Sequence, residues 1–383
     1  MSLTTASWLY ALGALALSGI VAFAVTPVSA RLARRFGVLD HPSEPDSDGY
    51  KKHADATPYL GGVAIFCGVV VGSLLIIAAL GAGTAHIITG FPLAIAVALI
   101  LGLIGLADDV RSLSRLMRFT AQLAAAGAAW LNDFQISVTP WTWVNLLLTF
   151  LWIVGITNAF NLLDNMDGLT AGVAGVAATS FAVMGVLGEM PALAIVAASL
   201  AGASFGFLAH NHHPAKIFMG DAGSLFLGLL LALIGIRLRF ENLVEVTFLI
   251  PVVVLGIPIF DTTLVVLSRI KHGRPVFLGG RDHVSHRLVR VGLPVWAAVG
   301  LMYWSALCLG WLGFVISRAT PEVGWMLLGF VFAVGLFLGA LLWRVPVYAE
   351  EPEAEERDAD AIAREGTPYL AAVDNASDRA SSG

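Results

Sequence analysis

The sequence has few charged residues for its length. Aspartate, glutamate, lysine and arginine make up 13% of its 383 residues, whereas a soluble globular domain carries roughly 25%. This shortage excludes a soluble globular protein, and the 57% of hydrophobic residues exclude a chain that is disordered throughout. The mean hydropathy is +0.82. The composition therefore predicts an all-α, polytopic integral membrane protein.

Cysteine is nearly absent, and the N-terminus lacks basic residues. Cys67 and Cys308 both lie in apolar runs, so neither a disulfide nor a thiolate metal site is expected. No lysine or arginine precedes the first apolar run, which argues against a cleaved signal peptide and for a first transmembrane helix. We expect no nucleic-acid partner for such a chain.

Long apolar runs alternate with polar breaks along residues 1–344. A bilayer core of about 30 Å is crossed by roughly 20 helical residues, and this pattern predicts about eleven spans, of which the fourth is short. The 40 glycines suit close packing of helices in lipid. The predicted spans cover residues 7–28, 58–80, 91–107, 119–132, 143–160, 170–187, 191–209, 223–240, 246–267, 294–316 and 323–343.

Lysine and arginine are divided unevenly between the two sides of these spans. Only Arg237, Arg239 and Arg318, of 22 basic residues, lie on the side of the N-terminus. Because basic residues favour the cytoplasmic side, we expect the N-terminus outside, the C-terminus in the cytoplasm, and the protein in the inner (cytoplasmic) membrane. Residues 1–344 form the predicted membrane-embedded domain, and the acidic residues 345–383 form a predicted disordered cytoplasmic tail.

Polar residues within or beside the spans collect on the predicted cytoplasmic side. Asp108 and Asp109 end the third span, Asp221 precedes the eighth, and Asp261 lies within the ninth. Ionisable groups at such positions are costly and usually functional, although any one of them alone could be a wetted helix end. The adjacent carboxylates of Asp108 and Asp109 repel each other, and a divalent cation or a proton would relieve that repulsion.

The segment NAFNLLDNMDGL carries polar residues at a spacing of three. Each step of three residues drifts by about 60° on a helix, so Asn158, Asn161, Asp164 and Asp167 cannot all face one point from a straight helix. A break near Asp164, with Gly168 supplying conformational freedom, would let them converge. Asp167 could be a simple N-cap, but four such residues exceed what one cap needs.

Two further segments combine residues for cations and for anions. In KIFMGDAGSLFLG, Asp221 stands at the start of an apolar helix, where it could hold Mg²⁺ beside phosphate or act as a simple N-cap. GRPVFLGGRDHVSHRL supplies arginines with His283 and His286, which suit phosphate oxygens. Zinc is the alternative, but no thiolate or His-Glu-x-x-His pattern accompanies the histidines. Mg²⁺, with Mn²⁺ as a substitute, and phosphoryl transfer to or from a lipid are the chemistry we expect.

Six segments together resemble the polyprenyl-phosphate N-acetylhexosamine-1-phosphate transferase superfamily. The superfamily includes the undecaprenyl-phosphate GlcNAc-1-phosphate transferases and the phospho-MurNAc-pentapeptide translocases. The resemblance implies transfer of a sugar 1-phosphate, GlcNAc-1-phosphate first of all, from a UDP-N-acetylhexosamine to undecaprenyl phosphate, with Mg²⁺ and release of UMP. It further implies a first step of cell-envelope polysaccharide synthesis, such as lipopolysaccharide, O-antigen or teichoic acid. The segments are TPYLGG (57–62), LADD (106–109), NAFNLLDNMDGL (158–169), PAKIFMGDAGS (214–224), PIFDT (258–262) and GRDHVSHRL (280–288).

The resemblance also implies roles for individual residues. Asp108 would be the base that deprotonates the lipid phosphate, or would assist a nucleophile, and Asp109 would support it. Asp221 would bind Mg²⁺, and Phe218 would stack on uracil. The other catalytic candidates are Asp164, Asp167, His283 and His286, and the other substrate-binding candidates are Lys52, Thr57, Asn158, Asn161, Arg281 and Arg287.

Two positions depart from the family pattern. Ser285 stands where the GlcNAc-transferring branch commonly has a histidine, and Asn165 stands where that pattern has glycine. Both leave the donor sugar open, and phospho-MurNAc-pentapeptide transfer is the alternative reaction. An ion-coupled transporter is the alternative of another class, but its carboxylates would lie near the bilayer midplane in repeated halves, and no repeat is found. Membrane lipid is an expected partner, and a homodimer is left open.

Overall fold

A computed structural model describes residues 3–40, 56–79, 90–240, 247–276 and 280–348. Within these ranges the protein is almost entirely helical, which confirms the predicted all-α class. Among the described residues, nine helices are long and apolar enough to cross a membrane. They are α1 (Leu3–Phe36), α2 (Gly61–Ala79), α3 (Phe91–Arg111), α5 (Thr142–Leu163), α6 (Leu169–Leu187), α7 (Pro191–Asn211), α8 (Gly220–Arg237), α12 (Val295–Ile316) and α13 (Pro321–Trp343).

A tenth apolar segment in the described residues is bent. The 3-10 helix η3 (Thr247–Leu249) and α9 (Ile250–Val254) meet α10 (Gly256–Lys271) at an angle of 71°. Pro258 explains the break, because it has no N–H to donate to the carbonyl of Val254, and its ring clashes with a continuous helix. The shorter elements are α4 (Arg115–Trp130), α11 (Val284–Arg290), β1 (Leu39–Asp40) and its antiparallel partner β2 (Thr57–Pro58).

The predicted fourth span corresponds to α4, so the count of eleven spans is not confirmed. A helix of 16 residues rises about 24 Å, less than a bilayer core of about 30 Å. Its two ends nevertheless lie near the two ends of α3. Arg118 pairs with Asp108 at 2.9 Å, and Phe134, just beyond α4, packs on Phe91 with ring centroids 6.2 Å apart. α4 therefore runs antiparallel along α3.

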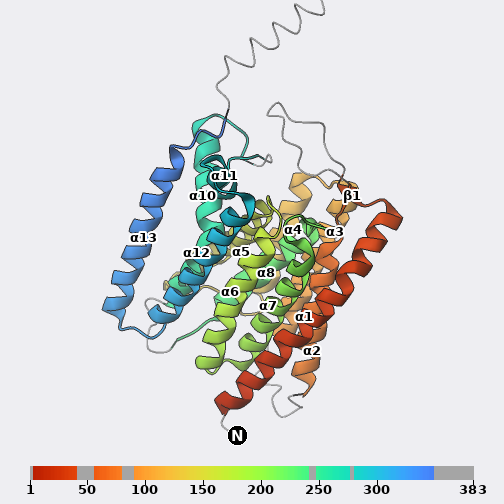
Figure 1. The fold of residues 1–383 in the computed structure, drawn as a ribbon. Helices are drawn as coiled ribbons and strands as arrows, with labels where there is room; N and C mark the ends of the chain where they lie inside the picture. Colours follow the sequence, from red (N-terminus) through yellow and green to blue (C-terminus); the bar gives the residue numbers. More distant parts are fainter. Residues whose placement is uncertain (1–2, 41–55, 80–89, 241–246, 277–279, 349–383) are drawn as a thin grey trace, which may run out of the picture.

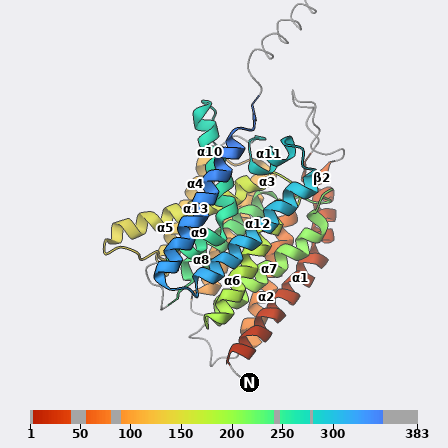
Figure 2. The ribbon, with the colours of Figure 1, turned by 60° about the vertical axis from the view of Figure 1, so that its left-hand side comes forward.

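Helices α6, α7 and α8 form the centre of the protein, and α13 lies at its edge (Figures 1 and 2). In α8, 89% of the most apolar stretch is buried inside the protein, against none in α13. Small residues allow the central packing. At Gly202 on α7, for example, a Cβ would overlap the carbonyl oxygen of Leu15 on α1. The exposed faces are themselves apolar, as on α13, where Phe332 is 69% exposed, which suits contact with lipid.

The end of the molecule opposite the N-terminus carries β1 and α11 (Figure 1). The chain that leaves α13 is held there as well. Arg287 Nη1 donates to the carbonyl of Val345 at 3.2 Å, and the Tyr348 hydroxyl donates to Asp282 at 2.7 Å. The first four residues of the predicted acidic tail therefore contact the helical body, and residues 349–383 lie outside the described residues.

Candidate active site

Helix α8 begins without a capping side chain of its own, and α3 supplies one. Met219 stands at the N-cap of α8 and makes no side-chain cap. The Asp109 carboxylate accepts the backbone N–H groups of Asp221 at 2.8 Å and Ala222 at 3.1 Å. Gly220 has a φ of 73°, and a Cβ there would overlap this carboxylate, so the close approach requires glycine. Asp109 thus holds the helix start that carries Asp221.

Asp108 and Asp221 face each other across the guanidinium of Arg118. Arg118 Nη1 lies 2.9 Å from Asp108 Oδ2 and 2.7 Å from Asp221 Oδ2. The other oxygen of Asp108 accepts the backbone N–H of Leu113, and the other oxygen of Asp221 accepts from Asn161 Nδ2 at 2.8 Å. The Asp221 side chain is 24% exposed, so it stays within reach of a substrate.

The break predicted between the fifth and sixth spans is present. α5 ends at Leu163, Asp164 follows it, and α6 begins after Gly168, which has a φ of 76°. Asp164 is exposed. Asp167 accepts the backbone N–H of Ala215 at 3.1 Å and pairs with His213 Nδ1 at 2.8 Å. Through Asp167, the turn between α5 and α6 is therefore hydrogen-bonded to the segment that precedes α8.

The four polar residues of this region do not converge on one point. Asn161 contacts Asp221, and Asp164 and Asp167 lie in the turn. Asn158 lies deeper in α5 and pairs with the side-chain amide of Gln122 on α4. This pairing takes Asn158 away from the carboxylates, so its predicted role in substrate binding has no contact to support it here.

The TPYLGG segment packs directly against the irregular segment that leads into α8. The backbone N–H of Phe218 donates to the carbonyl of Pro58 at 2.8 Å, and Gly61 N–H donates to the carbonyl of Phe218 at 3.0 Å. Tyr59 stacks edge-on against the Phe218 ring, with centroids 5.7 Å apart. Burial raises the Tyr59 pKa, and the nearby carboxylate charges raise it further. Thr57 is buried in β2, and Lys52 lies outside the described residues.

Of the two histidines of the 280–288 segment, His283 is fixed by a buried carboxylate. Asp261 on α10 is 0% exposed. Its Oδ2 lies 2.7 Å from His283 Nδ1, and its Oδ1 accepts the backbone N–H of Val284 at 2.7 Å. His286 lies one turn further along α11, where burial, followed by the charges of His283 and Arg281, lowers its pKa to about 4.

Arg287 is held by the framework of the protein, and its described contacts do not support its predicted role in substrate binding. It is 1% exposed. Its guanidinium donates to the carbonyls of Asp282 and Leu342 at 2.9 and 2.8 Å and to the Ser268 hydroxyl at 3.1 Å. With its N–H groups occupied by the framework, Arg287 anchors α11 against α10 and α13.

Asp282 forms the base of this loop. Arg269 Nε and Nη2 donate to its two carboxylate oxygens, both at 2.7 Å. Burial alone would raise the pKa of Asp282, but the hydrogen bonds from Arg269 and Tyr348 lower it to about 2. Asp282 is therefore a permanent anion that holds the loop, whereas Arg281 beside it is only half-buried.

Reasoning from sequence missed Arg118 as a member of the site and missed the partner of Asp261. Arg118 lies ten residues beyond Asp108 on the next helix, and no motif marks it, so only the packing of α3, α4 and α8 reveals its contacts. Asp261 was visible in PIFDT as a carboxylate within a span, but nothing in the sequence indicated its partner. The structure pairs it with His283 across 22 residues.

The donor set suits a hard cation. Asp108 and Asp221 supply carboxylate oxygens and Asn161 an amide, with no cysteine in the cluster. Within the described residues, no group of three His, Cys, Asp or Glu side chains is arranged to hold a metal ion. Mg²⁺ commonly takes only one or two carboxylates and completes its shell with water and substrate phosphates, so these residues fit Mg²⁺.

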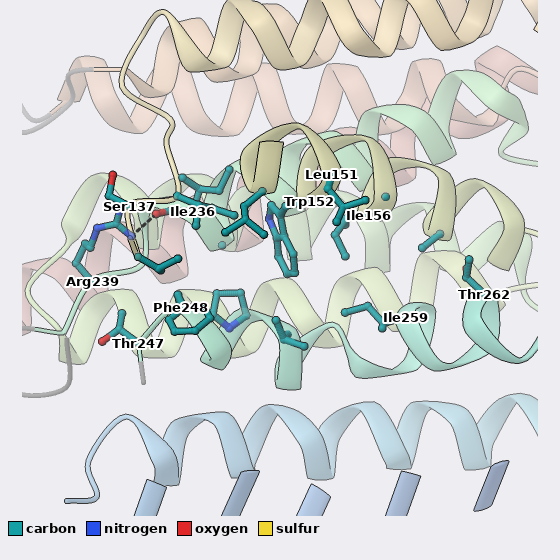
Figure 3. Close-up of a pocket in the computed structure, with 18 of the residues that line it drawn as sticks. Ser137, Leu151, Trp152, Ile156, Ile236, Arg239, Thr247, Phe248, Ile259 and Thr262 are labelled. Atoms are coloured by element: carbon teal, nitrogen blue, oxygen red, sulfur yellow. Dashed lines mark hydrogen bonds between the residues drawn. The ribbon is translucent and has the colours of Figure 1, made fainter. Parts of the chain in front are cut away.

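An apolar cavity of about 770 Å³ lies between α5, the C-terminal end of α8 and the bent segment, and none of the residues of this cluster lines it (Figure 3). Trp152 and Ile156 of α5 line one side, and Phe248 and Ile259 of the bent segment line the other. Arg239 stands at one end, and Thr262, next to Asp261, stands at the other. The bend between α9 and α10 thus bounds an apolar space that leads to the helix carrying Asp261.

Comparison with known proteins decides the family. The family model described as glycosyl transferase family 4 matches residues 91–239. A Bacillus subtilis (strain 168) protein, named probable undecaprenyl-phosphate N-acetylglucosaminyl 1-phosphate transferase, is 34% identical over 324 residues, which cover 82% of this chain and 86% of the relative. The chain belongs to glycosyl transferase family 4.

Two further relatives show the range of the family. The decaprenyl-phosphate N-acetylglucosaminephosphotransferase of Mycobacterium tuberculosis (strain ATCC 25618 / H37Rv) is 33% identical and covers 81% of this chain and 82% of the relative. A phospho-N-acetylmuramoyl-pentapeptide-transferase of Bacillus cytotoxicus is 29% identical over 73% of this chain and 88% of the relative. Membership of glycosyl transferase family 4 confirms the resemblance, while the roles of single residues stay predictions.

Proposed function

We propose that this protein transfers GlcNAc-1-phosphate from UDP-GlcNAc to undecaprenyl phosphate and releases UMP. The observation that carries the proposal is the Asp108–Arg118–Asp221 cluster at the start of α8, with Asn161 on Asp221. It combines carboxylates for a hard cation with a guanidinium for phosphate. The names of the relatives in Bacillus subtilis and Mycobacterium tuberculosis agree with this reaction.

Two anionic substrates repel each other, and the site must offset that repulsion. Asp221 would hold Mg²⁺, which would supply positive charge at the donor diphosphate when bound. Arg118 Nη1 already lies within 3 Å of the Asp108 and Asp221 carboxylates, and it is placed to donate to a phosphate oxygen. Lys52 is proposed to reach the same phosphates, although it lies outside the described residues. Mn²⁺ is the proposed substitute for Mg²⁺.

The chain's own groups then align the reaction. Asp108 accepts the proton of the lipid phosphate, and that phosphate attacks the β-phosphorus of the donor in line, with UMP as the leaving group. Asp109 positions Asp221 through the backbone of α8. Phe218, with its ring beside Tyr59, is the proposed platform for uracil. Asp164, Asp167, His283 and His286 are proposed to border the nucleotide and the diphosphate.

The cavity between α5 and α10 is the proposed place for the lipid chain. Its walls are mostly aliphatic and aromatic, which suits a polyprenyl chain, because moving apolar surface out of water is favourable. Its inner end reaches Thr262, one residue from Asp261. A chain lying there would bring its phosphate toward the end of the protein that carries α11 (Figure 1).

The membrane arrangement belongs to the same proposal. We infer eleven crossings of the inner membrane, with α4 as the short one, the N-terminus outside and the active site in the cytoplasm. The unequal division of lysine and arginine supports this orientation. Residues 1–344 would be the transferase domain and 345–383 an acidic extension. The product would enter a cell-envelope polysaccharide, lipopolysaccharide or teichoic acid among them, and the enzyme could work as a homodimer.

The experiment that tests the function is UMP release by the purified full chain. The protein is incubated with undecaprenyl phosphate, Mg²⁺ and, in turn, UDP-GlcNAc, UDP-GalNAc and UDP-MurNAc-pentapeptide. We expect UMP release with UDP-GlcNAc that depends on both the lipid and Mg²⁺. Asp221→Asn serves as the inactive control. Release only with UDP-MurNAc-pentapeptide would replace the proposed reaction by the alternative one.

A further inference from the structure

The turn after α5 and helix α11 meet at one pair of side chains, Asn165 and Ser285. The Ser285 hydroxyl donates a hydrogen bond of 2.6 Å to Asn165 Oδ1. Ser285 is 0% exposed and lies between His283 and His286 in the sequence. A buried hydroxyl that lost this acceptor would carry the full cost of its desolvation. The contact therefore ties two segments 120 residues apart.

Asn165 is held in place from the side of α5. Its Nδ2 donates to the carbonyl of Leu162 at 3.0 Å, and its backbone N–H donates to the carbonyl of Leu163 at 2.8 Å. The backbone of Asn165 also hydrogen-bonds to the His286 ring. The amide oxygen of Asn165 is thereby fixed toward α11, and the same residue contacts α11 twice.

The same end of α5 carries the contact to the carboxylates. Asn161, four residues before Asn165, donates to Asp221 at 2.8 Å. One short stretch of chain thus touches Asp221 on one side and α11 on the other. The hydrogen bond between Asn165 and Ser285 therefore connects the stretch of chain that contacts Asp221 to the helix that carries the histidines.

Helix α11 needs such a link, because a helix of seven residues is marginal by itself. Asp261 holds the N-terminal end of α11 through His283 and Val284, and Arg287 attaches α11 to Ser268 of α10. Neither contact reaches the turn after α5. The hydrogen bond of Ser285 sets the position of α11 relative to that turn.

We propose that Asn165 and Ser285 are positioning residues whose hydrogen bond aligns His283 and His286 with the Asp108–Asp221 carboxylates for the transfer step. The inference deepens the proposed function and rests on it. Asn165 and Ser285 are also the two positions at which the sequence departs from the family pattern. Their contact gives both departures one physical reason, since the serine hydroxyl needs an acceptor that a glycine side chain could not provide.

The test compares Ser285→Ala, Asn165→Ala and the double variant with wild type in the UMP-release assay. A matched control is Ser204→Ala, because Ser204 is also buried but donates only to the Leu200 carbonyl of its own helix. We expect each single variant to lower kcat about fivefold, which is about 1 kcal/mol, with less than a twofold change in the KM for UDP-GlcNAc. The double variant should be no slower than the slower single variant.

Several results would overturn the inference. A double variant about 25-fold slower would show that the two side chains act independently. A higher KM with unchanged kcat would show donor binding instead of alignment, and an equal loss in Ser204→Ala would show a general packing defect. Asn165 is only half-buried, so its variant keeps the test open if Ser285→Ala does not fold.

Hydrogen exchange separates this inference from the proposed function, because it needs no substrate. In the purified full-length variants, amides of residues 284–290 should exchange faster than in wild type and in Ser204→Ala, while those of α6 stay unchanged. Unchanged exchange and unchanged kcat in an active enzyme would overturn the inference alone. A wild-type protein that releases no UMP with any donor would overturn the proposed function and, with it, the catalytic role of the pair.

Discussion

Replacing Asp109 with alanine removes the cap of α8, whereas replacing Asp108 removes one of the two carboxylates around Arg118. The two aspartates are adjacent in the sequence, and their side chains leave α3 about 100° apart. Asp109 accepts two backbone N–H groups of α8, and Asp108 pairs with Arg118. The two substitutions should therefore have different effects, although the sequence treats the pair as one motif.

The structure sets the size of each effect. Loss of one N-cap hydrogen bond costs about 1 kcal/mol, and Asp109 supplies two such bonds together with a negative charge at a helix N-terminus, which contributes about 0.5 kcal/mol. We expect Asp109→Ala to lower the free energy of unfolding by about 2.5 kcal/mol. Asp108 shares a guanidinium that is 31% exposed, and such pairs contribute about 0.5 kcal/mol. Asp108 also accepts the backbone N–H of Leu113, which contributes about 1 kcal/mol, so Asp108→Ala should cost about 1 kcal/mol less stability than Asp109→Ala.

In the activity assay, the Asp108 substitution should have the larger effect and the Asp109 substitution the smaller one. Asp109 acts on Asp221 through the backbone, so Asp109→Ala should raise the Mg²⁺ concentration at half-maximal UMP release, and high Mg²⁺ should restore most of kcat. Asp108 is the proposed base, worth about 10²–10⁴-fold, and high Mg²⁺ should not restore kcat in Asp108→Ala. Thermal unfolding in detergent and UMP release at graded Mg²⁺ measure both effects on the same preparations.

One pattern of results would refute this reasoning. If Asp108→Ala unfolds earlier than Asp109→Ala and regains its kcat at high Mg²⁺, then Asp108 is the structural residue and a metal ligand. The cap on α8 would then not be what holds Asp221. Asp133→Asn is a suitable control, because this aspartate lies beyond α4, at the other end of α3 from the site, and asparagine tolerates its φ of 63°.

Three further predictions follow from the same contacts. Asp221→Asn should fold like wild type but lose nearly all UMP release, and its Mn²⁺ binding, measured by electron paramagnetic resonance, should be weaker. Near-normal UMP release would show that Asp221 serves only as a residue at the start of α8. In the folded protein the pKa of His286 is lowered from 6.5 to about 4. As the pH falls from 6.5 to about 4, the unfolded chain therefore binds a proton at His286 before the folded protein does, and stability falls. The unfolding midpoint of His286→Gln should fall less than that of wild type over this range. In intact cells a cysteine at exposed Leu131, in a Cys308→Ala background, should react with an impermeant thiol reagent, and one at exposed Val291 should not; the reverse would invert the orientation.

Local sequence features predicted the helices well, because membrane spans need long apolar runs and satisfy their backbone hydrogen bonds internally. The two exceptions come from packing. α4 has only 16 residues but is aligned along α3 by contacts at both of its ends. The ninth span is broken near Pro258, and the 71° bend depends on neighbours that a hydropathy pattern does not represent.

For the candidate site too, the sequence predicted some features and packing decided others. Sequence alone identified Asp108, Asp109, Asp221 and the histidines, because ionisable groups beside apolar helices are costly and stand out. It also predicted the break after Asp164, since a polar spacing of three and a glycine mark it. The distinct tasks of Asp108 and Asp109 could not be predicted, because adjacent residues differ only in what packs against them.

Only the tertiary structure decided which polar groups meet. Arg118 contacts Asp221 across 103 residues and Ser285 contacts Asn165 across 120, and no local pattern encodes such pairs. Arg287 appeared equivalent to Arg281 in the sequence, yet packing buries it to 1% exposure and occupies its donors with carbonyls. A residue's chemistry is set by its type, which the sequence contains. Its partners are set by how helices far apart in the chain pack, and that decides whether the chemistry serves the substrate or the fold.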